Sequence, residues 1–174
     1  MKTVTINQQP TTVEEFTKLR DELATTPEGG AAVFLMAYKI FNENESLGEQ
    51  CLVIAIDRGS LQEGNVYKGF KLLNGDLSRI KSQLAQNPKL PNSYIKGSTA
   101  ENDYSVNLPY IFEFSTNSSS GTEADGYIKF FVECSGADSP RPLHVMKNNR
   151  DIWKAKNWSS VLVGIKKKAI DDDI

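Results

Sequence analysis

The sequence has little of the chemistry that catalytic and metal-binding sites commonly use. Its 174 residues contain one histidine and two cysteines, and the cysteines lie far apart, outside any Cys-x-x-Cys pair. A tetrahedral zinc site needs several such ligands, and Asp171–Asp173 are more typical of a charged tail than of a chelate. Phosphate-binding glycine loops, His-Glu-x-x-His and nucleophile-elbow motifs are also missing. We therefore expect no metal and no cofactor, and no motif indicates an enzyme.

The sequence also lacks an excess of one charge and any long apolar run. Twenty basic side chains against 22 acidic ones give a formal net charge of -2, so no global field attracts nucleic acid or an anionic membrane. No stretch approaches the roughly 18 apolar residues of a membrane span. The first residues lack the apolar core of a secretory signal. We expect a cytoplasmic protein with no nucleic-acid or membrane partner.

The few cysteine and histidine side chains are expected to be structural. Cys51 and Cys134 both have apolar neighbours in the sequence, which predicts buried, reduced thiols of low reactivity. His144 alternates with Leu143 and Val145 in a strand pattern, so it should point to the opposite face of a sheet from those two. No catalytic residue is assigned.

Two amphipathic or apolar segments near the start predict helices. Thr12 and Glu15 have the spacing of a capping box, and the apolar positions that follow predict a helix over residues 12–24. Thr26 followed by Pro27 predicts the start of a second helix that runs to Phe41. Because this helix is apolar on nearly every side, we expect it at the centre of the core.

Two further helices are expected before residue 90. Ser46 and Glu49 have capping-box spacing and predict a helix that ends near Arg58. A buried strand over the short apolar run inside it is the alternative. Asp76 predicts the N-cap of a fourth helix, closed at residues 87–88 by Asn-Pro.

The second half changes to a period of two residues, which is typical of strands. Alternation predicts antiparallel strands over residues 110–114, 127–134, 143–146, 152–155 and 158–165. The Ser-, Gly- and Thr-rich segment from Ser115 to Asp125 predicts an exposed, mobile hairpin loop, and Asn148-Asn149 predicts a tight turn. Trp153 and Trp158 fall in or beside strands and are expected to pack in the core.

Helices followed by antiparallel strands predict an α+β fold in which N-terminal helices pack on a C-terminal twisted antiparallel sheet. We expect a single domain over residues 1–174. Residues 12–90 should be mainly helical, residues 94–165 mainly antiparallel strands, and residues 166–174 a solvated charged tail.

Four segments, residues 26–32, 94–104, 135–142 and 162–166, resemble an uncharacterised bacterial family, a domain of unknown function. The family has no assigned activity, so the resemblance carries over no functional residue. A looser likeness concerns architecture. Helices before a twisted sheet, with a tryptophan in the strand around residue 153, look like the cystatin-like cone of nuclear-transport-factor-type domains. Such cones host enzymes, ligand binders and interaction modules alike.

Two polar segments, residues 94–104 and 135–142, supply the candidate ligand-binding residues, which are Arg141, Asp138, Lys96, Tyr104 and Ser139. In the functional interpretation, Arg141 grips an anion with its planar donors, Asp138 orients it, and Lys96 and Tyr104 line the same recess. In the structural interpretation, which we favour, Asp138 and Ser139 accept backbone hydrogens within a turn while Arg141 pairs with an acid of the protein.

Three functions remain open at this point. The lack of catalytic motifs favours a non-catalytic module that binds a small ligand or a protein partner. An enzyme that uses Asp138, Glu101 or His144 as an acid or base in a cone-shaped pocket is the first alternative. An immunity-type or inhibitory protein, which acts by surface complementarity, is the second.

Overall fold

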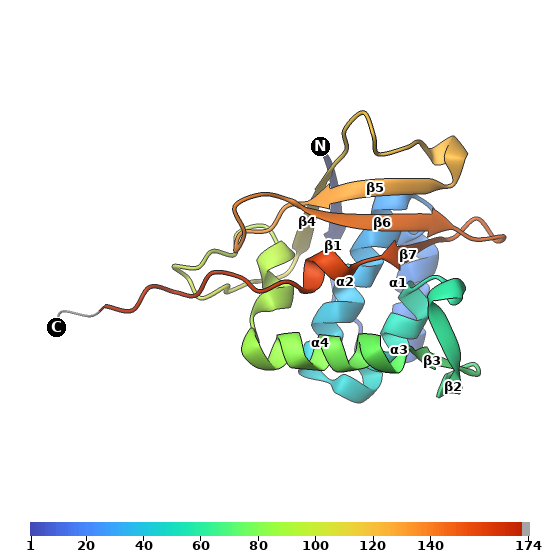
Figure 1. Cartoon of the computed structure of the whole chain (residues 1–174), viewed down its shortest axis with the longest axis horizontal. Coiled ribbons are helices and arrows are strands. Elements are labelled where there is room, and N and C mark those ends of the chain that lie inside the picture. Colours follow the sequence, from blue (N-terminus) through green and yellow to red (C-terminus); the bar gives the residue numbers. More distant parts are fainter. Residues whose placement is uncertain (172–174) are drawn as a thin grey trace.

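The computed structural model describes residues 1–171 and has an α+β fold (Figure 1). Its helices are α1 (Val13–Leu23), α2 (Pro27–Glu43), α3 (Glu45–Ala55) and α4 (Asn74–Gln86). Its strands are β1 (Lys2–Ile6), β2 (Leu61–Tyr67), β3 (Phe70–Leu72), β4 (Tyr110–Ser115), β5 (Tyr127–Val132), β6 (Arg141–Lys147) and β7 (Trp153–Asn157). Five of the strands form one antiparallel sheet in the order β1-β4-β5-β6-β7, and β2 and β3 pair separately.

The first two helices begin where the sequence predicts. The Thr12 hydroxyl accepts a hydrogen bond from the backbone of Glu15, and the Thr26 hydroxyl accepts one from the backbone of Gly29. Each bond satisfies a donor that the first turn of a helix leaves free, and Pro27 occupies the first helical turn, where its missing N–H costs nothing. Cap residues therefore position α1 and α2.

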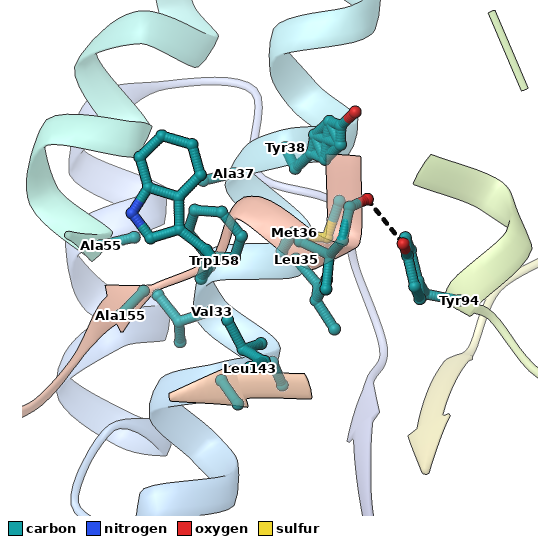
Figure 2. Close-up of a cluster of buried hydrophobic side chains, with 14 of the residues drawn as sticks. Val33, Leu35, Met36, Ala37, Tyr38, Ala55, Tyr94, Leu143, Ala155 and Trp158 are labelled. Atoms are coloured by element: carbon teal, nitrogen blue, oxygen red, sulfur yellow. Dashed lines mark hydrogen bonds between the residues drawn. The ribbon is translucent and has the colours of Figure 1, made fainter. Parts of the chain in front are cut away.

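Helix α2 is the centre of the core, as predicted. Every residue from Ala31 to Phe41 is buried, and Figure 2 shows side chains of this helix packed against residues of β6, β7 and the C-terminal segment. The ring of Trp158 packs on that of Phe34, with 5.5 Å between their centroids. Trp153 is also buried, so both tryptophans are packing residues, as expected.

Two glycines allow the close approach of α2 to its neighbours. A Cβ on Gly30 would lie 2.6 Å from the Cβ of Trp153 on β7, which is far inside van der Waals contact. A Cβ on Gly48 would lie 2.0 Å from the Cα of Phe41, where α3 crosses α2. Larger side chains at these positions would push the helix away from the sheet and the two helices apart.

Two predicted helix starts are wrong in detail. Helix α3 begins after Asn44, whose side chain accepts from the backbone of Leu47, so the cap is Asn44 and not Ser46. Asp76 lies inside the first turn of α4, and Leu73 stands at the cap position without a side-chain hydrogen bond. Both helices form because their apolar faces pack on the core. The start signals in the sequence accompany this packing and are not its cause.

The strand predictions are confirmed for β4 to β7 and wrong at both ends of the chain. Residues 158–165 form no strand, because Ser159–Leu162 is a short 3-10 helix that buries Val161 and Leu162. Strand β1 was not predicted, although its Val4 and Ile6 are buried at alternate positions. The small sheet of β2 and β3 was not predicted either.

The loop between β4 and β5 is more structured than its composition predicts. Ser120 is only 2% exposed, and its carbonyl accepts a 2.9 Å hydrogen bond from the backbone of Lys129. A reciprocal capping box joins Thr122 and Asp125. The other positions between 116 and 125 are exposed, as expected.

The start of the predicted charged tail is tied to the body of the protein. The backbone N–H of Lys166 donates to the Gly136 carbonyl at 3.0 Å, while residues 167–171 are exposed. Asp172 and Asp173, which the prediction also placed in this tail, lie outside the described residues.

Candidate functional site

The two polar segments meet through a ladder of small side chains. The backbone N–H of Ser135 donates to the carbonyl of Ser93 at 2.8 Å, and the hydroxyls of Ser98 and Ser135 lie 2.9 Å apart. The Cys134 thiol donates to the Ser93 hydroxyl at 3.3 Å. Hydroxyl and thiol groups thus fix the segment around residues 93–98 against the end of β5.

A recess of about 190 Å³ opens between these segments. Its lining comes from the polar segments and from the adjoining ends of β4 and β5. The lining residues are Ser93, Tyr94, Ile95, Lys96, Gly97, Ser98, Glu113, Glu133, Cys134 and Ser135. Lys96 is the one predicted ligand-binding residue among them.

Two acidic residues, Glu113 on β4 and Glu133 directly after β5, are among those that line this recess. The backbone N–H of Glu133 donates to the Glu113 carbonyl at 3.0 Å, so the two residues are directly opposite, next to the paired residues Phe114 and Val132. Opposed residues on antiparallel strands have Cβ atoms about 5 Å apart. Neither carboxylate belongs to an ion pair with a basic side chain of the described chain.

Sequence reasoning missed Glu113 and Glu133 as site residues. Both lie within predicted strands, but only the register of the hairpin makes them neighbours. The long β4–β5 loop does not fix that register, so the signal was incomplete.

Arg141 is buried and engaged with the protein itself. Its side chain donates to the hydroxyl of Tyr94 at 3.0 Å and to the carbonyls of Val163 and Gly164 at 2.6 Å each. The residue is 9% exposed, and it forms no ion pair with any described acid. The expected acidic partner was wrong, because carbonyl and hydroxyl dipoles take its place.

Asp138 does not orient Arg141. It pairs instead with the ammonium group of Lys166, at 2.5 Å, on the exposed surface. The hydrogen bond between the two lowers the pKa of Asp138 and raises that of Lys166. Tyr104 donates its hydroxyl hydrogen to the Lys166 carbonyl, and Ser139 is exposed. Asp138 and Tyr104 therefore secure the C-terminal segment, and neither they nor Ser139 line the recess.

Tyr94 joins the recess to the buried arginine. Its hydroxyl donates to the Val161 carbonyl at 2.5 Å while accepting from Arg141, an arrangement visible in part in Figure 2. Burial raises the pKa of Tyr94 well above that of a free phenol, although the Arg141 charge acts in the opposite direction. Tyr38 is buried nearby, and its pKa is raised for the same reason. Its hydroxyl has no hydrogen-bond partner among the described residues.

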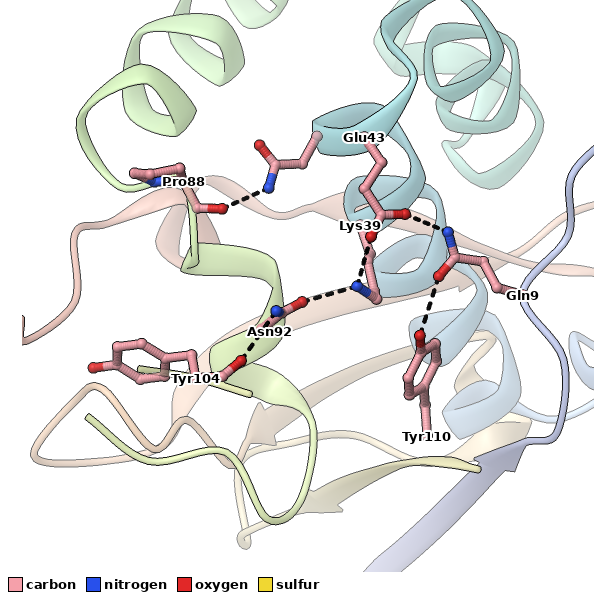
Figure 3. A network of polar contacts seen from close by, with 8 residues as sticks. Gln9, Lys39, Glu43, Pro88, Asn92, Tyr104 and Tyr110 are labelled. Carbon is pink, nitrogen blue, oxygen red and sulfur yellow. Dashed lines mark hydrogen bonds and ion pairs between the residues drawn. The ribbon is translucent and has the colours of Figure 1, made fainter. Parts of the chain in front are cut away.

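A buried lysine positions the segment that carries the recess (Figure 3). Lys39, which is 5% exposed on α2, donates to Glu43 at 2.9 Å and to the side chain of Asn92 at 3.0 Å. Asn92 in turn donates to the Tyr104 carbonyl at 3.1 Å. Gln9 donates to Glu43 and accepts from Tyr110, which connects the network to β4.

His144 lies on the exposed face of the sheet and outside the recess lining. Leu143 and Val145 point into the core, as predicted, and the His144 ring packs on Tyr127 with 5.5 Å between centroids. Partial burial lowers the pKa of His144. The two cysteines are buried and unpaired, as predicted.

Residues 1–171 contain neither a metal-binding cluster nor a membrane-spanning helix. No group of three or more His, Cys, Asp or Glu side chains in this range is arranged to hold a metal ion. No helix in the same range is both long enough and apolar enough to cross a membrane.

Together, the fold and the recess define an α+β protein with a polar site at the end of its sheet. The chain belongs to the family described as Domain of unknown function (DUF6935), whose model matches residues 8–169. No curated protein matches the chain, and no solved structure does. The family assignment confirms the predicted resemblance to a domain of unknown function. The cystatin-like cone stays a prediction.

Proposed function

We propose that this chain is a non-catalytic binding module whose recess, between residues 93–98 and the adjoining ends of β4 and β5, holds a small polar ligand with a positive charge. One observation carries this proposal, namely the direct opposition of Glu113 and Glu133 without a basic partner. Like charges directly opposite on a sheet are destabilising, so a bound cation would relieve a repulsion that the free protein retains.

The surrounding groups suit an ammonium or guanidinium compound. The hydroxyls of Ser98 and Ser135 line the recess and accept or donate hydrogen bonds as a ligand requires. Lys96 lies at the same recess and would contact an anionic group on that ligand. A free amino acid, which carries both charges, has this chemistry. The size of the recess, about 190 Å³, restricts the ligand to a small molecule.

Arg141, Asp138 and Tyr104 take a supporting part in this proposal. Their hydrogen bonds fix residues 163–166 behind the recess. We also propose a cytoplasmic location, which the unpaired state of the two buried cysteines supports.

The test is a thermal-shift and calorimetric screen of the protein against small ammonium and guanidinium compounds and free amino acids. We expect at least one to raise the melting temperature and to bind saturably. The variants Glu113→Gln and Glu133→Gln should lose this binding while melting at the same temperature as the unliganded wild type or higher, because the repulsion is gone. Glu123→Gln, on the exposed β4–β5 loop, is the matched control and should bind normally. Binding that survives in both recess variants, or no binding to any compound, contradicts the proposal.

A further inference from the structure

The sheet has two edge strands, which differ in whether their outer backbone groups are hydrogen-bonded. Strands β1 and β7 are the edges. At β7, the backbone N–H of Trp153 donates to the Ala24 carbonyl at 2.9 Å, and the Ala155 carbonyl accepts from Asp57 at 2.8 Å. Ile56 also bridges Ala155. The outward N–H of Trp153 and the outward carbonyl of Ala155 are thereby occupied, which hinders pairing of β7 with another chain.

The backbone of β1 is open along its outer edge. The carbonyls of Ile111 and Glu113 on β4 accept from Lys96 and Glu133, so they face away from β1. Backbone groups alternate in direction along a strand, so Phe112 is the residue that exchanges hydrogen bonds with its partner on β1, which is Val4.

It follows that the N–H and C=O groups of Thr3 and Thr5 point outward, away from the sheet. No backbone or side-chain hydrogen bond within residues 1–171 reaches them. Two outward N–H groups and two outward carbonyls, two residues apart, are the template on which an added strand forms.

A groove runs along this edge between β1 and helix α1. It consists of two adjoining hollows of about 270 and 390 Å³, which share Thr5, Glu22 and Leu23 in their linings. The far wall is formed by α1, by Thr25 and Thr26, and by the first turn of α2. The open edge thus faces a trough rather than a flat surface.

The groove is acidic. Glu15, Glu22 and Glu28 line it, against one lining lysine, Lys18. The Oε2 atom of Glu28 has no hydrogen-bond partner among the described residues, but it forms a salt bridge with the Nζ atom of Lys2 at 3.6 Å. Glu22, by contrast, belongs to no ion pair of the described residues, and an acidic lining next to an open strand edge favours a basic ligand.

We propose that β1 binds an extended basic peptide segment of a partner protein by strand addition. Thr3 and Thr5 supply the main-chain hydrogen bonds, and Glu22 receives a lysine or arginine side chain of the added strand. A second copy of this chain suits the edge poorly, because a twofold pairing of β1 with β1 brings the same glutamates together. This site is separate from the recess and does not depend on the function proposed for it.

The test uses a short synthetic peptide that alternates lysine and valine, with a counterpart that alternates glutamate and valine. We expect the wild-type protein to bind the lysine peptide, to bind it more weakly as salt is raised, and not to bind the glutamate peptide. Thr5→Pro removes an outward N–H without removing a bond to β4, so it should weaken binding at least tenfold. Thr5→Val keeps that N–H and is the matched control.

A second variant, Glu22→Lys, changes the charge of the groove and leaves the strand intact. It should also weaken lysine-peptide binding at least tenfold, while far-ultraviolet circular dichroism stays unchanged. Absence of lysine-peptide binding by the wild type, equal binding of the glutamate peptide, or full binding by both Thr5→Pro and Glu22→Lys overturns the proposal. So does a wild-type dimer in sedimentation velocity that Thr5→Pro dissociates, because a second copy would then occupy the edge.

Discussion

The side chain of Arg141 donates to the hydroxyl of Tyr94 at 3.0 Å, and each of the two also binds a main-chain carbonyl of the C-terminal segment. A cation and a phenol, both buried, are therefore stabilised by the same stretch of backbone, from Val161 to Gly164. Side chains from two distant parts of the sequence hold this stretch in place, although it forms no strand.

Arg141→Ala should lower the free energy of unfolding by about 2 kcal/mol, because it removes the donor of three hydrogen bonds, one of them to the buried hydroxyl of Tyr94. Arg141→Lys should recover only part of this loss, since a lysine cannot present two donors in one plane. Urea unfolding measures both effects. Asp138→Ala, which removes an exposed ion pair, is the control and should change the midpoint little. Equal midpoints for Arg141→Ala and Asp138→Ala would refute the structural role of Arg141.

Phe34→Ala should destabilise the protein by about 3–5 kcal/mol, because the ring is fully buried on α2 and packs on Trp158. Urea unfolding followed by tryptophan fluorescence measures the loss. Val163→Ala is the comparison, since Val163 is 50% exposed and its carbonyl contact to Arg141 is unaffected. A cost well under 1 kcal/mol for Phe34→Ala would place α2 at the periphery of the core.

Cys51 should resist alkylation in the folded protein. Burial raises the pKa of its thiol to about 12, so the reactive thiolate is scarce at neutral pH and the sulfur is inaccessible. Mass spectrometry after iodoacetamide treatment should show an unmodified Cys51 under native conditions and complete modification in urea. Cys134 should also resist modification, because its sulfur is buried and donates to the Ser93 hydroxyl. Rapid native modification of either thiol contradicts the prediction.

Lys154 should make the stability of the protein rise with pH. Burial lowers its pKa from 10.5 to about 8, while its Nζ group donates to the Ile54 carbonyl at the end of α3. Between these two values the unfolded chain binds more protons than the folded chain, so the free energy of unfolding increases as pH rises through this window. Below about pH 8 the lysine is charged in both states and the cost of burying the charge is present in full.

Lys154→Met should remove that dependence. The free energy of unfolding, measured from pH 7.5 to 10 in urea, should rise with a steeper slope for the wild type than for the variant. Other titrating groups are common to both proteins and cancel in the comparison. Parallel slopes would show that Lys154 keeps an ordinary pKa in the folded state.

The sequence predicted the elements that depend on local signals. Helices α1 and α2 follow from Thr12 and Thr26, whose side chains bond within their own helices. The start of α3 was wrong because Asn44 and Ser46 are both good cap residues, and only the extended backbone at Asn44 distinguishes them. Strand β1 was not predicted because its partner, β4, lies more than 100 residues away in the sequence, as the pairing of Lys2 with Phe114 shows.

The location of the candidate site was predictable from the sequence, but the chemical groups that form it were not. The sequence marked residues 94–104 and 135–142 as the polar segments, and the structure brings them together at the Ser98–Ser135 contact. Two partners of Arg141 are main-chain carbonyls. Every residue has a carbonyl, so no pattern of side chains in the sequence predicts which ones Arg141 contacts. The opposition of Glu113 and Glu133 depends on strand register, which tertiary packing decides.

The carbonyls that hold Arg141 have a consequence for synthesis on the ribosome. Translation produces α2, the sheet strands and Arg141 before it produces Val163 and Gly164, which are the oxygen partners of the guanidinium. Until those two residues leave the exit tunnel, the guanidinium lacks two of its three hydrogen-bond acceptors and has only the Tyr94 hydroxyl, so its burial carries a large desolvation penalty. The nascent chain therefore completes its fold late, and a ribosome stalled before residue 163 carries an unfinished, exposed core that chaperones are able to recognise.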